Sequence, residues 1–188
     1  MSLNGGAVPM EPSTCGVTDF KDAPIPIGLE RFLGLVIRSL STALEDTVGS
    51  HEAGGFISLV GIAISEEVQA EYLRAAGAER LGREAVSNAL IDLKRRLGGD
   101  FYVIEDTAER LVLGNRRCPF GDLAKECPSL CTITSHVFGH MVAESQGYGR
   151  VTLAETIARG AQECRIVIDL DPDAPDHGGQ SYFGNGNA

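Results

Sequence analysis

Residues 115–164 gather more potential soft metal ligands and nucleophiles than any other part of the chain. Four of its five cysteines fall there, at Cys118, Cys127, Cys131 and Cys164. These thiols lie on different expected elements, namely a turn, the start of a helix and the start of a strand. If the thiols converge, the elements that carry them must pack around one point. This cysteine-rich segment therefore constrains the fold more than any other part of the sequence.

The size and charge of the chain exclude several classes of protein. Its 188 residues fit one domain. No apolar run reaches the roughly 18 residues of a membrane span, and no basic segment followed by an apolar one marks a signal peptide. The net charge of −10 disfavours direct binding to nucleic acid, whose phosphates repel an acidic chain. We therefore expect a cytoplasmic domain that neither enters a membrane nor binds nucleic acid directly.

Composition divides the chain into three parts. Residues 1–27 are rich in proline and glycine, which predicts a disordered N-terminal segment or linker in which Cys15 is an exposed bystander. Residues 28–171 show regular hydrophobic periodicity and are predicted to form a single domain. Residues 172–188 are polar and glycine-rich, which predicts a disordered tail.

Three helices are predicted before the first strand. Apolar residues recur at three- and four-residue spacing over 29–48, 56–72 and 83–97. The segment 56–64 is apolar on nearly every side, so a strand is the alternative there, and a helix would be buried in the core or against a second subunit. This pattern predicts a homodimer formed through the helices at 29–48 and 56–72.

The helix at 83–97 is predicted to bury one stripe and to expose a basic end. Its core stripe consists of Val86, Ala89, Leu90, Leu93 and Leu97. Lys94, Arg95 and Arg96 are assigned to the last turn, where positive charge favours the helix dipole.

The second half of the chain contributes strands and one further helix. Residues 101–106 and 110–115 read as a hairpin, and a helix is predicted from Cys127-Pro128 to about Gly147. Strands are predicted over 151–155 and 164–170. The resulting class is α+β, an antiparallel sheet of about four strands covered by about four helices.

The cysteines of the segment are suited to a metal centre. Cys118 in a turn, Cys127 and Cys131 near a helix start, and Cys164 at a strand start can meet as a four-thiolate site. Soft thiolates select zinc or an iron–sulfur cluster. The spacing is not that of a zinc ribbon, since the sequence has no Cys-x-x-Cys pair. An odd number of cysteines in a cytoplasmic chain also argues against a disulfide framework.

Two other interpretations of these cysteines stay open. Amide dipoles at a helix N-terminus lower the pKa of a thiol, so Cys127 could act as a nucleophile or a redox group. The sequence places no third orienting group beside it. The cysteines could also be buried as small hydrophobic residues, which suits Cys164 best. His136 and His140 could supply ligands, but their helical face is shifted from that of Cys131, and we expect them to be solvent-facing or hydrogen-bonded.

Several short motifs in a fixed order resemble a known family. They are C-P-F-G, P-S-L-C-T-I-T-S-x-V-F-G and G-Y-G-R-V-T-L-A-E-T-I-A-R-G-x-x-x-C-R-I-V-I-D-L, preceded by D-L-K-R-R-L-G-G-D-F-Y-V. Together they resemble the methanogen output domain family over residues 28–171. The resemblance implies a sensory or output module of prokaryotic signal transduction. Such modules are found at the ends of response regulators, histidine kinases and helix-turn-helix regulators.

Two weaker resemblances concern the same segment. The closing pattern of a glycine, a few residues, a cysteine and an apolar strand is similar to that of the vinyl-reductase-like small-molecule-binding domains. The Cys-Pro opening and the gap of twelve residues between Cys118 and Cys131 resemble the iron–sulfur sensing region of bacterial repressors of cluster assembly. The chain departs from that pattern because no third cysteine lies between Cys131 and Cys164, where Ser145 stands.

These observations favour a non-enzymatic sensory or regulatory domain of signal transduction or transcriptional control. It would bind a small ligand, a metal ion or a cluster near the cysteine-rich segment. We expect it to act as a homodimer and together with a separate signalling or transcription-regulator chain. The alternative is a thiol-dependent enzyme, a small hydrolase or a redox protein, that uses a cysteine at the 127–131 helix start.

Overall fold

The computed structural model describes residues 24–126 and 129–185, so the predictions for residues 1–23, Cys127 and Pro128 lie outside the described residues. The helices of the described part are α1 (Leu29–Val48), α2 (Ser50–Ala76), α3 (Arg83–Arg96), α4 (Leu123–Glu126) and α5 (Ser129–Gln146), with a 3-10 turn η1 (Ile157–Arg159). The strands are β1 (Phe101–Asp106), β2 (Arg110–Asn115), β3 (Tyr148–Glu155), β4 (Cys164–Asp169) and β5 (Gln180–Phe183). The predicted α+β class is confirmed.

The strands form one open sheet in the order β1-β2-β4-β3-β5, and each neighbouring pair is antiparallel. β4 lies in the middle, hydrogen-bonded to both β2 and β3. Its Ile166 and Ile168 are buried in the core, as the alternation of a half-buried strand requires. In this register Cys164 lies opposite Asn115, at the end of the sheet where the candidate site is found.

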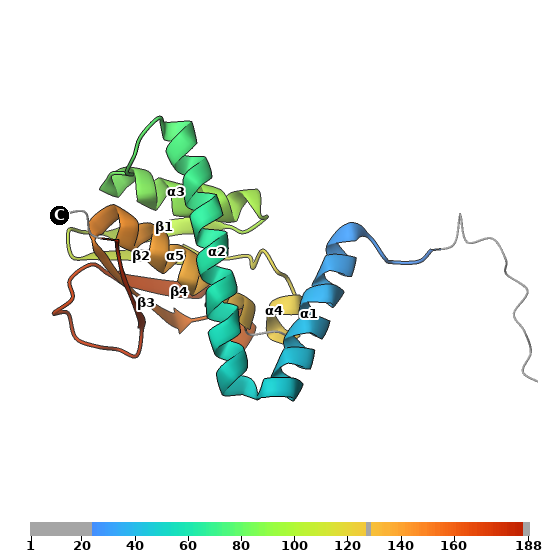
Figure 1. Ribbon diagram of the computed structural model, residues 1–188. Coiled ribbons are helices and arrows are strands. Elements are labelled where there is room, and N and C mark those ends of the chain that lie inside the picture. Colours follow the sequence, from blue (N-terminus) through green and yellow to red (C-terminus); the bar gives the residue numbers. More distant parts are fainter. Residues whose placement is uncertain (1–23, 127–128, 186–188) are drawn as a thin grey trace, which may run out of the picture.

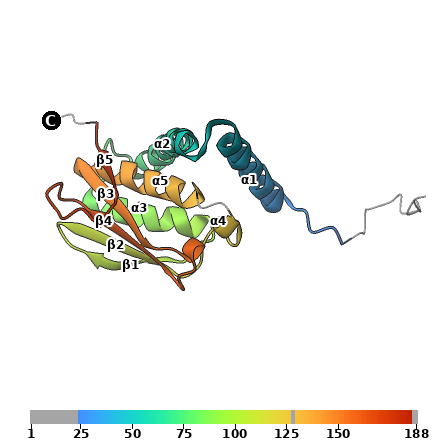
Figure 2. The ribbon, with the colours of Figure 1, turned by 90° about the horizontal axis from the view of Figure 1, so that it is seen from below.

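The helices form two layers over the same face of the sheet. α3 and α5 pack directly on the strands, and α2 crosses α5 on the outside (Figure 2). The core between these layers is made of aliphatic and aromatic side chains, including Leu90, Leu111, Leu113, Phe138, Met141, Val142, Ile166 and Ile168. On α5, the side chains that face this core include Leu130, Val137, Phe138 and Met141, all at most 3% exposed.

Residues 56–64 are helical, which settles the alternative between a helix and a strand. α2 begins at Ser50, earlier than predicted, because Gly54 and Gly55 continue the helix instead of interrupting it. Gly61 lets α2 approach α5 closely, since a Cβ there would lie 2.6 Å from Cβ of His136. None of the described helices has the length and apolar character needed to cross a membrane.

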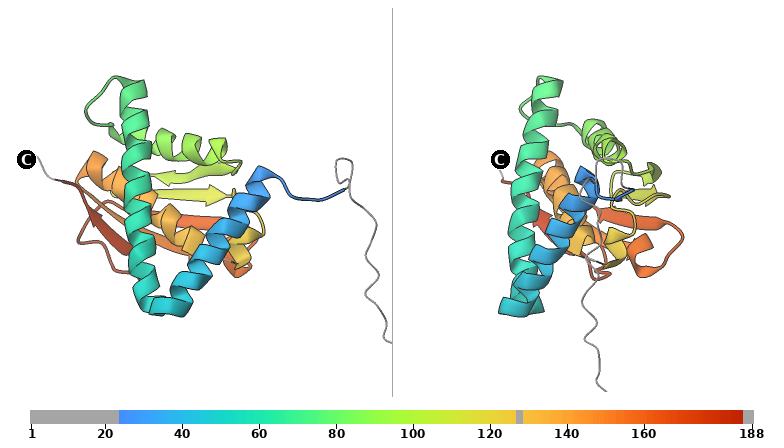
Figure 3. Two further views of the ribbon diagram at one scale, coloured as in Figure 1. Left: turned by 45° about the vertical axis from the view of Figure 1, so that its right-hand side comes forward. Right: turned by 90° about the vertical axis from the view of Figure 1, so that its right-hand side faces the viewer.

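α1 stands apart from the layered core. It joins α2 at Gly49, whose φ of +82° turns the chain, and the two helices then diverge (Figures 1 and 3). The far part of α1 lies beside α4. α1 is thus attached to the rest of the domain by the turn at Gly49 and by its contacts with the short helix α4.

The prediction of a disordered tail over 172–188 is wrong for residues 180–183. Residues 180–183 form β5, which pairs with β3, so the sheet has a fifth strand that the sequence did not indicate. Tyr182 of β5 is 5% exposed, and its ring packs over Gly139 of α5. Burial of this one aromatic side chain helps to hold a strand whose composition is otherwise polar.

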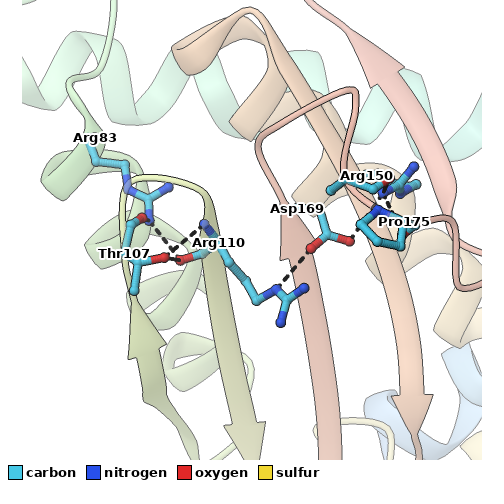
Figure 4. A network of polar contacts seen from close by, with 7 residues as sticks. Arg83, Thr107, Arg110, Arg150, Asp169 and Pro175 are labelled. Atoms are coloured by element: carbon cyan, nitrogen blue, oxygen red, sulfur yellow. Dashed lines mark hydrogen bonds and ion pairs between the residues drawn. The ribbon is translucent and has the colours of Figure 1, made fainter.

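A network of charged residues ties the loop before β5 to the sheet (Figure 4). The buried carboxylate of Asp169 accepts a hydrogen bond of 2.9 Å from Nε of Arg110 and lies 3.6 Å from a guanidinium nitrogen of Arg150. Arg150 also donates to the carbonyl oxygens of Ala174 and Pro175, at 2.7 and 2.9 Å. Asp169 therefore connects β2, β3 and β4 to the chain that leads into β5.

Candidate functional site

Three thiols of the cysteine-rich segment line one cavity, which we call the cysteine cavity. Cys118 lies in the turn after β2, Cys131 in the first turn of α5, and Cys164 at the start of β4. The volume of the cavity is about 30 Å³. That space holds a water molecule or a single ion, whereas pockets for organic ligands usually measure roughly 300–1,000 Å³. The other walls are formed by Phe101, Asn115, Pro119, Phe120, Thr134, Leu153, Thr156 and Ile166.

The thiols of Cys118, Cys131 and Cys164 therefore lie around one cavity, as expected for cysteines in a turn, at a helix start and at a strand start. Cys127 lies outside the described residues. Within residues 24–126 and 129–185, no group of three or more histidine, cysteine, aspartate or glutamate side chains is arranged to hold a metal ion. The three thiols therefore surround the cavity without forming a complete coordination sphere. Metal binding by the four cysteines stays a prediction.

Burial makes two of these thiols weak acids. It raises the pKa of Cys131, and the neighbouring thiols of Cys118 and Cys164 raise that pKa further. Burial also raises the pKa of Cys118, although two backbone amides of the following turn act in the opposite direction. The sulfur of Cys164 accepts a hydrogen bond of 3.3 Å from the backbone amide of Ile157. Near neutral pH, Cys118 and Cys131 are therefore protonated in the structure as it stands.

A buried ammonium group lies beside the cavity. Lys94 of α3 is 3% exposed, and its Nζ donates a hydrogen bond of 2.9 Å to Oγ1 of Thr134 on α5. Burial lowers the pKa of Lys94 to about 8, while the thiols of Cys118, Cys131 and Cys164 act in the opposite direction. The lysine and the thiols are thus coupled, because a negative charge on any thiol would favour the charged form of the lysine.

Aromatic rings surround Lys94 where a carboxylate would be expected. Nζ lies 5.2 Å from the ring centre of Phe138, 5.7 Å from that of Phe120 and 5.9 Å from that of Phe101. No aspartate or glutamate in the described part of the chain forms an ion pair with this lysine. Contacts with ring faces offset part of the cost of burying the charge. An anion in the cavity would offset considerably more, because the interior screens charges weakly.

Lys94 is the site residue that sequence analysis missed. It was assigned only to the helix dipole, although it follows Leu90 by four positions and Val86 by eight, and both of those side chains are fully buried. Leu97 was predicted to complete the core stripe, but it is 51% exposed. The buried stripe of α3 therefore ends in a charged residue. A lysine in line with two core residues was the signal that could have found it.

The two histidines of the segment lie elsewhere on α5. His136 is 7% exposed, and its Nδ1 lies 3.2 Å from the hydroxyl of Tyr182. The ring of His140 packs edge-on against the same tyrosine. Burial lowers the pKa of His136, and His140 lowers it further. Neither histidine lines the cysteine cavity, and His136 is a hydrogen-bonded residue of the core, as the sequence predicted.

A larger groove adjoins the cysteine cavity on the side of α1. This α1 groove has a volume of about 770 Å³ and is lined by residues of α1, by Leu97 and by the segment from Pro119 to Glu126. Pro119 and Phe120 line both the α1 groove and the cysteine cavity. The turn that begins at Cys118 is therefore a wall shared by the two spaces.

α1 is attached to the same segment by two contacts. A Cβ on Gly34 would lie 3.1 Å from Cδ2 of Leu123, so the helix backbone approaches α4 closely at this glycine. Arg38 of α1 forms an ion pair with Glu126 of α4. The route from the cavity to α1 thus runs through the turn after Cys118 and through α4.

A comparison with known proteins identifies the family of the chain. The family model of methanogen output domain 1 matches residues 36–169. The matched region includes Lys94 and the cysteines that line the cavity. No curated protein matches the chain. Because the family model covers well over half of the sequence, the chain belongs to the methanogen output domain 1 family, which implies a signalling output role.

Proposed function

We propose that this domain is a non-enzymatic sensory module whose input is a thiophilic metal ion or an iron–sulfur cluster bound at the cysteine cavity. Cys118, Cys131 and Cys164 would supply three ligands, and Cys127 would supply the fourth. One observation carries the proposal. Thiols from three separate elements meet beside a buried lysine, Lys94, that has no carboxylate partner among the described residues.

The charge of such a site matches its surroundings. A divalent ion held by four thiolates has a net negative charge, which is costly to bury without a cation nearby. The ammonium of Lys94 would offset part of that charge, and the anionic site would raise the pKa of Lys94 above about 8. Metal binding would also release the protons that burial keeps on the thiols.

The size of the cavity favours the same class of input. A space of about 30 Å³ accepts a single ion once the thiols draw together. A cluster would need some displacement of the turn at Pro119-Phe120. An organic effector would need a far larger opening of the walls.

The thiol-dependent enzyme is less well supported. A nucleophilic cysteine needs a lowered pKa, whereas burial raises the pKa of both Cys118 and Cys131. The two histidines of the cysteine-rich segment, His136 and His140, do not line the cavity and so are not placed to act there as a general base.

The shared wall offers a way for binding to reach the surface. A metal that draws Cys118 toward Cys131 would move the Pro119-Phe120 turn, and the α1 groove on the other side would change shape. Binding would then favour one position of α1 over another, which is the kind of two-state element that a signalling switch requires.

Metal analysis of protein purified without oxygen tests the proposal. We expect stoichiometric zinc or iron in the intact chain and its loss in the Cys118→Ser, Cys131→Ser and Cys164→Ser variants. Cys15→Ser is the matched control and should retain the metal, since this cysteine lies outside the cysteine-rich segment. A content below about 0.2 equivalents, even after incubation with zinc or with iron and sulfide, would contradict the proposal, because a thiolate site retains its ion.

The role of Cys127 needs its own measurement. Cobalt(II) bound to thiolates gives charge-transfer absorption that grows with the number of sulfur ligands, so titration of the intact chain and of Cys127→Ser compares the two donor sets. Weaker absorption and weaker affinity in the variant are expected. Identical spectra would remove Cys127 from the ligand set and leave the other three cysteines with a non-cysteine fourth ligand.

A further inference from the structure

α1 carries an apolar stripe that is largely exposed in the described part of the chain. Leu29, Leu33, Val36 and Leu40, which we call the α1 stripe, are 74%, 49%, 37% and 65% exposed. Leu33 also lines the α1 groove, together with Gly34 and with Arg38, which makes its ion pair with α4. An amphipathic helix normally buries its apolar side. In the described part of the chain the stripe is instead left largely open.

α2 extends this exposed apolar surface. Phe56, Leu59, Val60 and Ile64 are 50%, 63%, 51% and 39% exposed, although the side of α2 around Gly61 packs against α5. Together with the α1 stripe these residues of the two helices expose on the order of 700 Å². Each partner in a standard protein–protein interface contributes about 800 Å². The surface thus has the size of one half of an interface.

The spacing of the α1 stripe suits another helix. Its residues are separated by four, three and four positions, which is the repeat of about 3.5 residues found where two helices pack along a seam. A two-fold axis would place a second stripe of the same length and chemistry against the first. The stripe is therefore self-complementary in the way that a symmetric dimer requires.

The charges of α1 argue against a lipid surface as the occupant. Interfacial helices that bind anionic lipid carry an excess of lysine and arginine on the polar side. In α1 the positive charges of Arg31 and Arg38 are outnumbered by the negative charges of Glu30, Glu45 and Asp46, and the whole chain has a net charge of −10. Such a helix gains no net attraction from anionic headgroups.

We propose that a second copy of this chain covers the α1 stripe, so that two α1–α2 pairs pack together about a two-fold axis. This interface is inferred from the exposed α1 stripe and does not depend on what binds in the cysteine cavity. If the cavity does bind a metal, the α1 groove would connect that site to the dimer interface, since it lies behind the same helix.

Light scattering coupled to size-exclusion chromatography of the full chain tests the proposal. We expect a dimer for the natural sequence and a monomer for the double variant Leu29→Glu with Leu40→Glu. Thr42→Glu is the control, because Thr42 is exposed on α1 outside the stripe, and this variant should stay dimeric. Circular dichroism of the monomeric variant should match the natural protein, since Leu29 and Leu40 are 74% and 65% exposed within one chain. A natural protein that is monomeric at micromolar concentration would overturn the proposal.

A photo-reactive amino acid in place of Val36 identifies what covers the stripe. Crosslinking is expected to give a species of twice the chain mass, joined through residues of α1 or α2 of the second copy. Crosslinks within one chain, to residues 1–23, would instead make that segment the occupant. Co-sedimentation of monomeric protein with phosphatidylglycerol vesicles would make a membrane the occupant. Either of these two outcomes overturns the proposal.

Discussion

Nζ of Lys94 lies 2.9 Å from Oγ1 of Thr134, and this hydrogen bond joins α3 to α5 inside the core, beside the cysteine cavity. The hydroxyl of Thr134 in turn lies 3.4 Å from the carbonyl oxygen of Leu130, to which it can donate. An ammonium group has three N–H donors, so one accepting hydroxyl leaves it only partly satisfied. The domain therefore holds a charge that its interior compensates incompletely.

Replacement of Lys94 by methionine is expected to stabilise the metal-free domain at neutral pH. Methionine fills a similar volume without a charge. The pKa of Lys94 is about 8 in the folded chain, against 10.5 for an ordinary lysine, so the unfolded chain binds this proton more tightly than the folded chain does. Burial of the ammonium thus opposes folding, by on the order of 3 kcal/mol at most.

The stability difference between the Lys94→Met variant and the natural protein should shrink as the pH rises. Below about pH 8 the lysine is charged in both states, and the difference is largest. Between about pH 8 and 10.5 only the unfolded chain keeps the proton, so the natural protein gains stability relative to the variant. Urea unfolding at pH 7 and at pH 10 measures the change. Lys125→Met, at an exposed position of α4, should shift stability by no more than about 0.5 kcal/mol at either pH.

The charged network of Figure 4 should be sensitive to loss of its one carboxylate on β4. The side chain of Asp169 is 2% exposed and faces both Arg110 and Arg150. Asp169→Ala leaves the guanidinium of Arg150, which is 7% exposed, without a counter-charge and is expected to destabilise the fold by about 3–5 kcal/mol. Asp122→Ala removes a carboxylate that is 88% exposed and should have almost no effect. Equal unfolding midpoints for the two variants would contradict this account.

The hydrophobic periodicity of the sequence predicted those helices whose position depends mainly on their own residues. α1 and α3 have one clear apolar repeat each, and their observed ends differ from the predicted ends by at most a residue. β5 is different, because four polar and aromatic residues in a glycine-rich tail carry no repeat, and only the edge of β3 and the surface of α5 make a strand of them. Such pairing depends on tertiary contacts that sequence patterns do not contain.

The candidate site was predicted only in part for a similar reason. The cysteines could be named from the sequence because their residue type and clustering are visible there. Their convergence depends on the register that sets Cys164 opposite Asn115 at the end of β2, close to the turn of Cys118. Lys94 could have been found from its position on the stripe of α3, but its aromatic surroundings come from β1, α5 and the turn after β2. Those contacts follow from packing and not from local sequence.

Gly139 is expected to be essential for the docking of β5. A Cβ at this position of α5 would collide with the ring of Tyr182. The hydroxyl of Tyr182 lies 3.2 Å from Oγ of Ser135 and 3.2 Å from Nδ1 of His136, so the ring cannot easily move aside. Alanine normally stabilises a helix interior by about 0.5–1 kcal/mol relative to glycine. At Gly139 the collision should reverse that sign, with a loss of about 1–3 kcal/mol typical of overpacking. Thermal unfolding of Gly139→Ala measures the sign directly.

Gly55→Ala separates the collision from the general effect of the substitution. Gly55 also lies inside a helix, α2, but a Cβ there would have no neighbour within 4 Å. This variant should therefore show the ordinary gain in helix stability of about 0.5–1 kcal/mol. Because the two substitutions are chemically identical, opposite signs can come only from the surroundings of the two glycines. A gain in both variants would mean that β5 leaves α5 at little cost, and Tyr182 would then not be what holds the last strand to the domain.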